Sequence, residues 1–156
     1  MSDSCLSYSY FDNSTFLDAN LESSVITNAQ FINSNFSKSN LIECDLGNSR
    51  IISTNFSLCN LSLSDFTRSD VFNSRFLNCQ LLKTNFLAAK IESSEILSSN
   101  LSNSTIDTTT FVNSSLKNSN LQNAIFSNSE FVDLDMTNVN LANADLRYAD
   151  LSKVNL

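Results

Sequence analysis

The chain has 156 residues and a net charge of −7, so it is long enough for one domain and poorly suited to direct contact with a nucleic-acid phosphate backbone. Apolar residues make up 42% of it, more than a disordered polar segment carries. It has one Gly and no Pro, the residues that usually form turns and linkers, and no composition shift marks a boundary. We therefore predict a single domain over residues 1–156.

The strongest pattern is a period of five residues. Starting at Leu6, every fifth residue is large and apolar as far as Leu156, with no insertion. A helix turns by about 100° per residue and a strand changes face at every residue, so neither keeps positions five apart on one side. The residue two before each apolar position is Ser, Thr, Ala or Cys, except at Leu134, Val139 and Val154. Each unit therefore points one small and one large side chain into a common interior.

A second period of 20 residues is superimposed on the first. Every twentieth residue from Leu21 to Leu141 is Leu, and each is preceded by Asn or, once, by Gln80. Four units therefore make one coil, and like residues stack in adjacent coils. We expect the amides that precede these Leu residues to form a hydrogen-bonded ladder. A neighbouring row is aromatic and consists of Phe16, Phe36, Phe56 and Phe76.

These repeats resemble those of the pentapeptide-repeat family, whose motif is A(D/N)LXX. The stretches "DANLESS" (18–24) and "ANADLRYADLSKVNL" (142–156) carry the motif almost verbatim, and the pattern covers essentially the whole chain. The resemblance implies an all-β fold, a right-handed quadrilateral β-helix. The period predicts about 7.75 coils of 20 residues. The repeat runs to Leu156, so no capping helix is expected.

Residues suited to catalysis or metal binding are scarce. The chain has no His, which removes the usual general base and a common zinc ligand. Cys44, Cys59 and Cys79 occupy small inward positions and are expected to be buried thiols, whereas Cys5 is expected to be free. We predict no catalytic, cofactor-binding or metal-binding residues, no cofactor, and no enzymatic activity.

The N-terminus lacks the basic and apolar regions of a secretory signal, and no apolar run is long enough to span a membrane. These features favour a cytoplasmic protein without membrane contact.

One row of outward positions is unusually apolar. On one side of the coil, it consists of the residue that follows the large inward residue of each unit. Between residues 32 and 132, Glu92 is the only polar member of this row. Stacked in adjacent coils, these side chains are expected to form a continuous exposed stripe that binds a protein partner. The alternative is that β-branched residues simply suit a sheet surface. The predicted binding residues are Ile32, Ile52, Phe72, Val112 and Val132.

These observations favour a non-enzymatic, protein-binding scaffold with an unidentified partner. The resemblance adds a second hypothesis, because bacterial family members that mimic DNA bind DNA gyrase or topoisomerase IV and confer quinolone resistance. The stretch "SEFVDLDMTNVNL" (129–141) resembles the late coils of those proteins, although their projecting loops and C-terminal helix are absent here. A purely structural module or an effector fragment is a third hypothesis. The acidic end that would serve DNA mimicry consists of Asp133, Asp135, Asp145 and Asp150.

The last coil suggests a weak end-to-end homodimer. Leu156 continues the column of inward apolar residues, and burying such an end against a second copy would be favourable. The acidic residues around the same end would oppose this contact at low salt.

Overall fold

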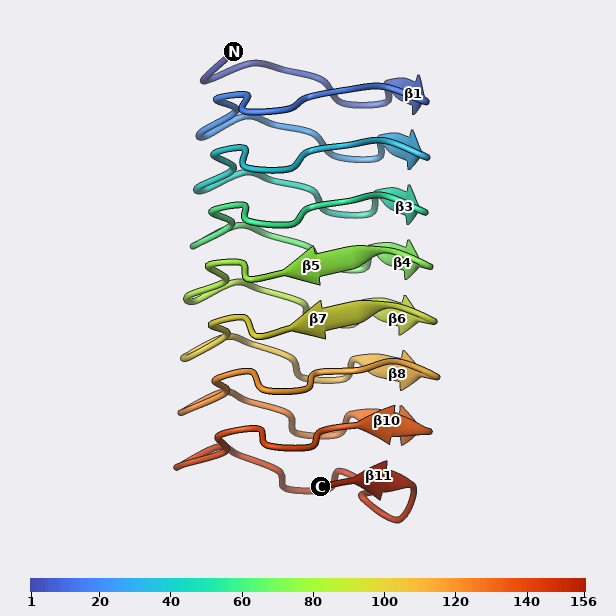
Figure 1. Cartoon of the computed structure of the whole chain (residues 1–156), viewed down its shortest axis with the longest axis vertical. Coiled ribbons are helices and arrows are strands. Elements are labelled where there is room, and N and C mark those ends of the chain that lie inside the picture. Colours follow the sequence, from blue (N-terminus) through green and yellow to red (C-terminus); the bar gives the residue numbers. More distant parts are fainter.

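The computed structural model describes all residues from 1 to 156 and shows a column of stacked coils (Figure 1). The column is built from short strands and tight turns, and no helix in it has the length and apolar character needed to cross a membrane. Seven strands, one from each successive coil, form a parallel sheet on one side. They are β1 (Tyr10–Asp12), β2 (Gln30–Ile32), β3 (Arg50–Ile52), β4 (Asp70–Phe72), β6 (Lys90–Glu92), β8 (Thr110–Val112) and β9 (Glu130–Val132).

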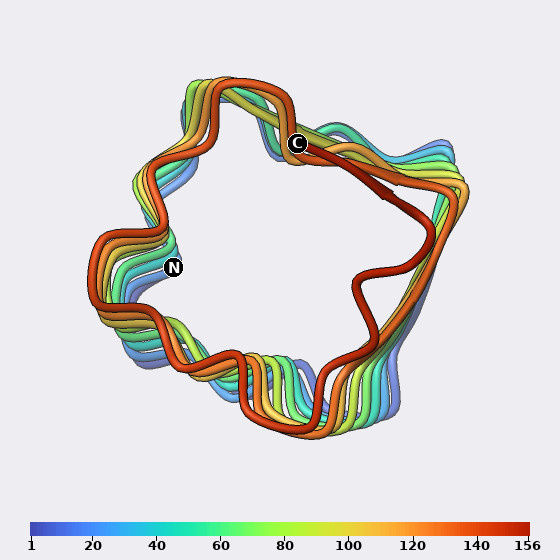
Figure 2. The same cartoon turned by 90° about the horizontal axis from the view of Figure 1, so that it is seen from below.

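Two smaller sheets lie on the next side of the coil. Strand β5 (Arg75–Leu77) pairs with β7 (Glu95–Leu97), and β10 (Leu134–Asp135) pairs with β11 (Val154–Asn155). All of these pairs are parallel and join residues 20 apart, such as Phe31 with Ile51. Seen along the column, successive coils overlie one another around a roughly four-sided outline (Figure 2). The predicted fold class, an all-β quadrilateral β-helix, is confirmed.

The large residue of each unit fills the interior. From Leu21 to Met136, every fifth residue is at most 3% exposed. The aromatic row stacks face to face, with ring centroids 4.4 Å apart for Phe16 and Phe36, 4.9 Å for Phe36 and Phe56, and 4.8 Å for Phe56 and Phe76. The interior is thus a column of buried side chains in which each coil packs against its two neighbours.

The small residue of each unit does more than fill space. Its hydroxyl or thiol usually donates a hydrogen bond to the carbonyl oxygen of an inward residue in the preceding coil. Ser49 Oγ lies 2.9 Å from the carbonyl oxygen of Ile26, and Cys59 Sγ lies 2.8 Å from that of Phe36. Two buried hydroxyls, of Ser69 and Ser104, have no such partner. These bonds satisfy carbonyl groups that would otherwise be costly to bury.

The coil turns without glycine because one residue per unit adopts a left-handed conformation. Every fifth residue from Asp3 to Tyr148 has a positive φ, near 50–60°. Asn is the most frequent residue at this position, and it tolerates this region better than most residues do. Leu58 and Leu63 also adopt it, at φ 63° each, against their intrinsic preference. The single glycine, Gly47, is not among the positive-φ residues.

The predicted amide ladder is only partly formed. Amide-to-amide bonds join Asn20 to Asn40, and a continuous run joins Gln80, Asn100, Asn120 and Asn140. Between Asn40 and Gln80 the ladder is interrupted. The side-chain oxygen of Asn60 instead accepts bonds from the backbone N–H and hydroxyl of Ser62, 3.2 Å and 2.8 Å away. Asn100 accepts the same two bonds from Ser102 and also one from Asn120, so a turn bond and the ladder can share one amide oxygen.

Candidate protein-binding surface

The predicted apolar stripe lies on the outer face of the seven-stranded sheet. Parallel pairing aligns Ile32 with Ile52, Ile52 with Phe72, Phe72 with Glu92, Glu92 with Val112, and Val112 with Val132. We call this set the apolar column, and each coil's contribution to it one rung. The column is continuous because the strands keep the 20-residue register without a slip.

Exposure differs along the apolar column. Phe72 is 42% exposed, whereas Ile32, Ile52, Val112 and Val132 are each half-buried by their neighbours on the sheet. Side chains alternate across a strand, so the inward position of Val71 forces Phe72 outward. The structure therefore brings the five predicted residues together, with an exposed aromatic ring near their middle.

A shallow hollow surrounds Phe72. It has a volume of about 250 Å³ and is lined by Arg50, Ile52, Asp70, Phe72, Lys90 and Glu92. The ammonium of Lys90 lies 2.7 Å from a carboxylate oxygen of Glu92. The hydrogen bond to Glu92 raises the pKa of Lys90, so the ammonium stays charged. The negative charge of Glu92, the one polar residue of the apolar column, is therefore neutralised by Lys90.

A second outward column runs beside the apolar column, on the residue before each inward one. Its members alternate in charge through the middle of the sheet, because Arg50 pairs in register with Asp70, and Asp70 with Lys90. Gln30, Thr110 and Glu130 continue it toward the two ends. We call this set the charged column. Opposite charges in adjacent strands favour each other, which supports the register of the sheet.

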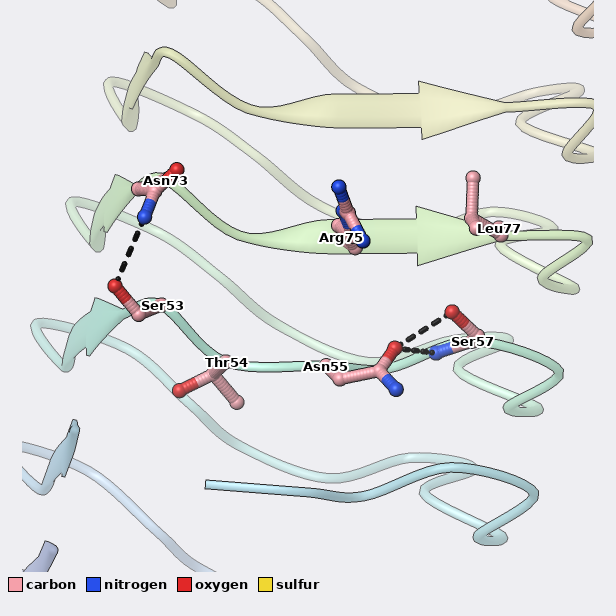
Figure 3. Close-up of a pocket in the computed structure, with 7 residues that line it drawn as sticks. All are labelled: Ser53, Thr54, Asn55, Ser57, Asn73, Arg75 and Leu77. Carbon is pink, nitrogen blue, oxygen red and sulfur yellow. Dashed lines mark hydrogen bonds between the residues drawn. The ribbon is translucent and has the colours of Figure 1, made fainter. Parts of the chain in front are cut away.

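A larger, polar groove lies around the corner from the apolar column (Figure 3). It has a volume of about 380 Å³ and a floor of short side chains, with Asn73 donating to Ser53 Oγ over 3.0 Å. Arg75 is the only cation that lines it, and its guanidinium is already paired with Glu95 at 3.2 Å. The lining contains no nucleophile next to a base, so the groove lacks the arrangement needed for covalent catalysis.

The predicted acidic end is not one patch. Asp133 and Asp150 are exposed and belong to the side of the seven-stranded sheet, whereas Asp135 belongs to the next side and Asp145 to the opposite neighbouring side. Asp135 is paired with Lys117 at 2.9 Å, and Asp145 with Arg147 at 2.6 Å. Two of the four carboxylates are therefore neutralised within the chain.

The same contacts depress carboxyl pKa values. Hydrogen bonds from Thr137 and from Lys117 lower the pKa of Asp135 to about 2. Hydrogen bonds from Arg147, first from its side chain and then from its backbone, lower the pKa of Asp145 to about 2. Both groups remain ionised at neutral pH. Their carboxylates accept hydrogen bonds from Thr137 and Arg147, two residues further on, and so stabilise local turns.

The cysteines divide as expected. Cys44, Cys59 and Cys79 are buried free thiols, and Cys5 is an exposed one. Burial raises the pKa of Cys59 to about 12 and that of Cys44 and Cys79 to about 11. Protonated, buried thiols are poor nucleophiles and poor metal ligands. No three His, Cys, Asp or Glu side chains converge as potential metal ligands.

One feature of the surface was missed in the sequence. Large apolar side chains other than the apolar column are exposed in the middle coils, including Leu58, Leu63, Leu82 and Leu87. They lie at the corners rather than on the sheet face. Their signal in the sequence is a Leu outside the five-residue register, which the inward period conceals.

Comparison with known proteins identifies the family. The model of the pentapeptide repeats matches eight copies over residues 4–41, 29–68, 39–78 and 126–156. No curated protein sequence matches the chain. These repeats cover more than half of the residues.

Solved structures are similar in fold. HetL, a pentapeptide repeat protein involved in heterocyst differentiation regulation in the cyanobacterium Nostoc sp. strain PCC 7120, has a TM-score of 0.64 and 15% identity, over 97% of this chain and 89% of HetL. A trypsin-treated variant of QnrB1, a plasmid-mediated fluoroquinolone resistance protein, has a TM-score of 0.50 and 18% identity, over 99% of this chain and 92% of that one. At these identities the likeness concerns the fold alone. The repeats and the coil geometry together show that the chain belongs to the pentapeptide-repeat family.

Proposed function

We propose that the protein is a non-enzymatic scaffold that binds another protein through the apolar column. The observation that carries this proposal is the exposed ring of Phe72 within a column of aligned apolar side chains on a regular sheet, interrupted only by Glu92, which is paired with Lys90. The largest exposed apolar patch of a soluble protein is often a binding site. The 42% exposure of Phe72 is the clearest case, because aromatic side chains contribute strongly to interfaces.

Propensity for strands is the competing explanation for the Ile and Val residues. The side of the coil that carries β5 and β7 tests this explanation. There too, the residue after each inward residue points outward. This residue is Ser37, Ser57 or Lys117 where the chain turns, and Leu77 or Leu97 where it forms β5 and β7. Apolar residues at this position therefore accompany strand formation, and the proposal depends on the exposed ring of Phe72 rather than on the Ile and Val residues alone.

A site-specific photo-cross-linker tests the proposal. A photoreactive phenylalanine analogue at position 72 should cross-link one defined protein in living cells. The yield should fall sharply when Ile52→Glu is added, because the new charge lies on the adjacent rung and is costly to desolvate. The matched control places the analogue at Tyr8, which is 80% exposed and lies on another side. Equal products at both positions, or no effect of Ile52→Glu, would reject the proposed surface.

DNA mimicry with binding to DNA gyrase or topoisomerase IV is the second candidate. It is favoured by the exposed, unpaired carboxylates of Asp133 and Asp150, which belong to the same side of the coil. A supercoiling assay with purified gyrase tests it directly. Inhibition that is lost in Asp133→Asn with Asp150→Asn would support mimicry, and unchanged supercoiling at high protein concentration would exclude gyrase as a target. Photo-cross-linking at position 72 distinguishes the two candidates, because mimicry does not require the apolar column.

A further inference from the structure

We infer that the apolar column is covered by a second copy of this chain, in an antiparallel, face-to-face dimer. The inference rests on the proposed function and names its partner. The two-fold axis would lie in the interface, parallel to the strands, midway between β4 and β6 (Figure 1). Two flat sheet faces would then pack as layers, about 10 Å apart.

The position of this axis follows from the order of residues in the apolar column. The two-fold axis passes between the rungs of Phe72 and Glu92. Each rung of one copy therefore faces the rung of the second copy that lies equally far from the axis in the opposite direction along the column. Ile32 then faces Val132 of the second copy, and Ile52 faces Val112. Four apolar contacts form, because each of these pairs occurs twice.

The centre of the interface is also compatible. Phe72 faces Glu92 of the second copy, next to the hollow that both of these residues line. Glu92 keeps its own partner, because Lys90 of the same copy is bound to it at 2.7 Å. The ring therefore meets the aliphatic part of a side chain whose charge is already neutralised.

The charged column makes the same axis favourable. Asp70 of one copy faces Lys90 of the other, and this opposite-charge pair occurs twice. Arg50 faces Thr110, and Gln30 faces Glu130. No two like charges face each other at any of these rungs.

Neighbouring registers fail by the same criterion. Moving the axis by half a rung in one direction places Asp70 opposite Asp70 and Arg50 opposite Lys90. Moving it by half a rung in the other direction places Lys90 opposite Lys90 and Glu92 opposite Glu92. Like charges in contact are strongly unfavourable, which excludes both half-rung registers. Moving the axis by a whole rung toward β8 places Asp70 opposite Glu130, and moving it by a whole rung toward β3 places Ile32 opposite Glu92. The charges and the apolar contacts together therefore select the register between β4 and β6.

The expected dimer is weak. The rungs from Ile32 to Val132 lie about 4.8 Å apart, and strands of three residues at about 3.3 Å each give a face on the order of 300 Å² per copy. The total is below the roughly 1,200 Å² at which stable interfaces begin. The wild-type chain should therefore dimerise only at high concentration.

Complementary charge reversals test the inference. Asp70→Lys alone should weaken self-association at least about tenfold, because the introduced ammonium would face Lys90 of the second copy. Lys90→Asp alone should do the same through two facing carboxylates. An equimolar mixture of the two variants should associate more tightly than either variant alone, because positions 70 and 90 then carry opposite charges across the interface. Analytical ultracentrifugation of each variant and of the mixture measures these three quantities.

The control uses the same charge changes on other sides of the column. Asp18→Lys and Lys83→Asp alter exposed residues outside the sheet face and should leave self-association unchanged. Far-UV circular dichroism confirms that all four variants retain the fold. Recovery in the mixture supports the inference, since effects within a single chain would persist in the mixture.

Two outcomes overturn the inference. One is a wild-type chain that remains monomeric at every concentration, and the other is a mixture that associates no better than its components. In either case the proposed function is judged separately, by whether the cross-linker at position 72 captures a different protein. Dimers formed through the ends of the column would be insensitive to both charge reversals.

Discussion

The register of the repeat predicts that two identical substitutions have very different costs. Phe56 lies in an inward position and is 0% exposed, whereas Phe72 lies in an outward position and is 42% exposed. We compare Phe56→Ala with Phe72→Ala, so that the atoms removed are the same. Only the location of the ring differs.

The expected magnitudes follow from packing. Removing a buried Phe from a core costs about 3–5 kcal/mol. Phe56 should lie at the upper end of that range, because its ring stacks on Phe36 at 4.9 Å and on Phe76 at 4.8 Å, and its loss removes a stacking neighbour from each. Complete burial of such a side chain is worth about 1.5–3 kcal/mol, so the partly buried Phe72 should contribute only about 1 kcal/mol.

Equilibrium unfolding in urea, followed by far-UV circular dichroism, measures both effects. The free energy difference is obtained from the shift in midpoint if the slope with urea is unchanged. A change in slope would show that part of the column unfolds separately, as repeat arrays can do. Equal destabilisation by the two substitutions, or a larger effect at Phe72, would refute the inward and outward assignment on which the apolar column depends.

Three further predictions concern thiols, acid and salt. In the native protein, a thiol reagent at pH 8 should modify Cys5 rapidly and the three buried cysteines only on unfolding. Fast reaction of Cys59 would contradict its burial and its pKa of about 12. The pKa values of Asp135 and Asp145, about 2 in the folded chain and about 4 when unfolded, contribute stability that is present above about pH 4 and is lost as the pH falls toward 2. Urea midpoints across that range should fall more steeply for wild type than for Asp135→Asn with Asp145→Asn. Association through the ends of the column should strengthen with added salt, because the unpaired carboxylates of Asp133 and Asp150 repel at low salt. A decrease in association with added salt, measured by sedimentation, would contradict this prediction.

The repeat pattern was sufficient to predict the architecture. A large apolar residue at every fifth position, with Leu or Phe recurring every twentieth, is compatible with a four-sided coil and with neither a helix nor an ordinary strand. The pattern also identified which side chains are buried, including Phe56 and Cys59, because the inward positions of every unit face one interior. The composition of the apolar column was visible for the same reason, since 20-residue spacing alone places Ile52 beside Phe72.

Outward side chains are not fixed by the period, and their contacts became known only from the folded coil. Asp135 and Asp145 looked like part of one acidic end, yet they lie on different sides and are paired with Lys117 and Arg147. The amide of Asn60 was expected in a ladder and bonds only to Ser62 in its own turn, whereas the amide oxygen of Asn100 takes part in both. Buried positions accept only apolar or small side chains, because an unpaired polar group or a cavity in the interior is costly. Exposed polar groups can instead bond to several neighbours or to water with nearly equal free energies. Those choices depend on the distances between columns and around corners, and these distances exist only once the coil is closed.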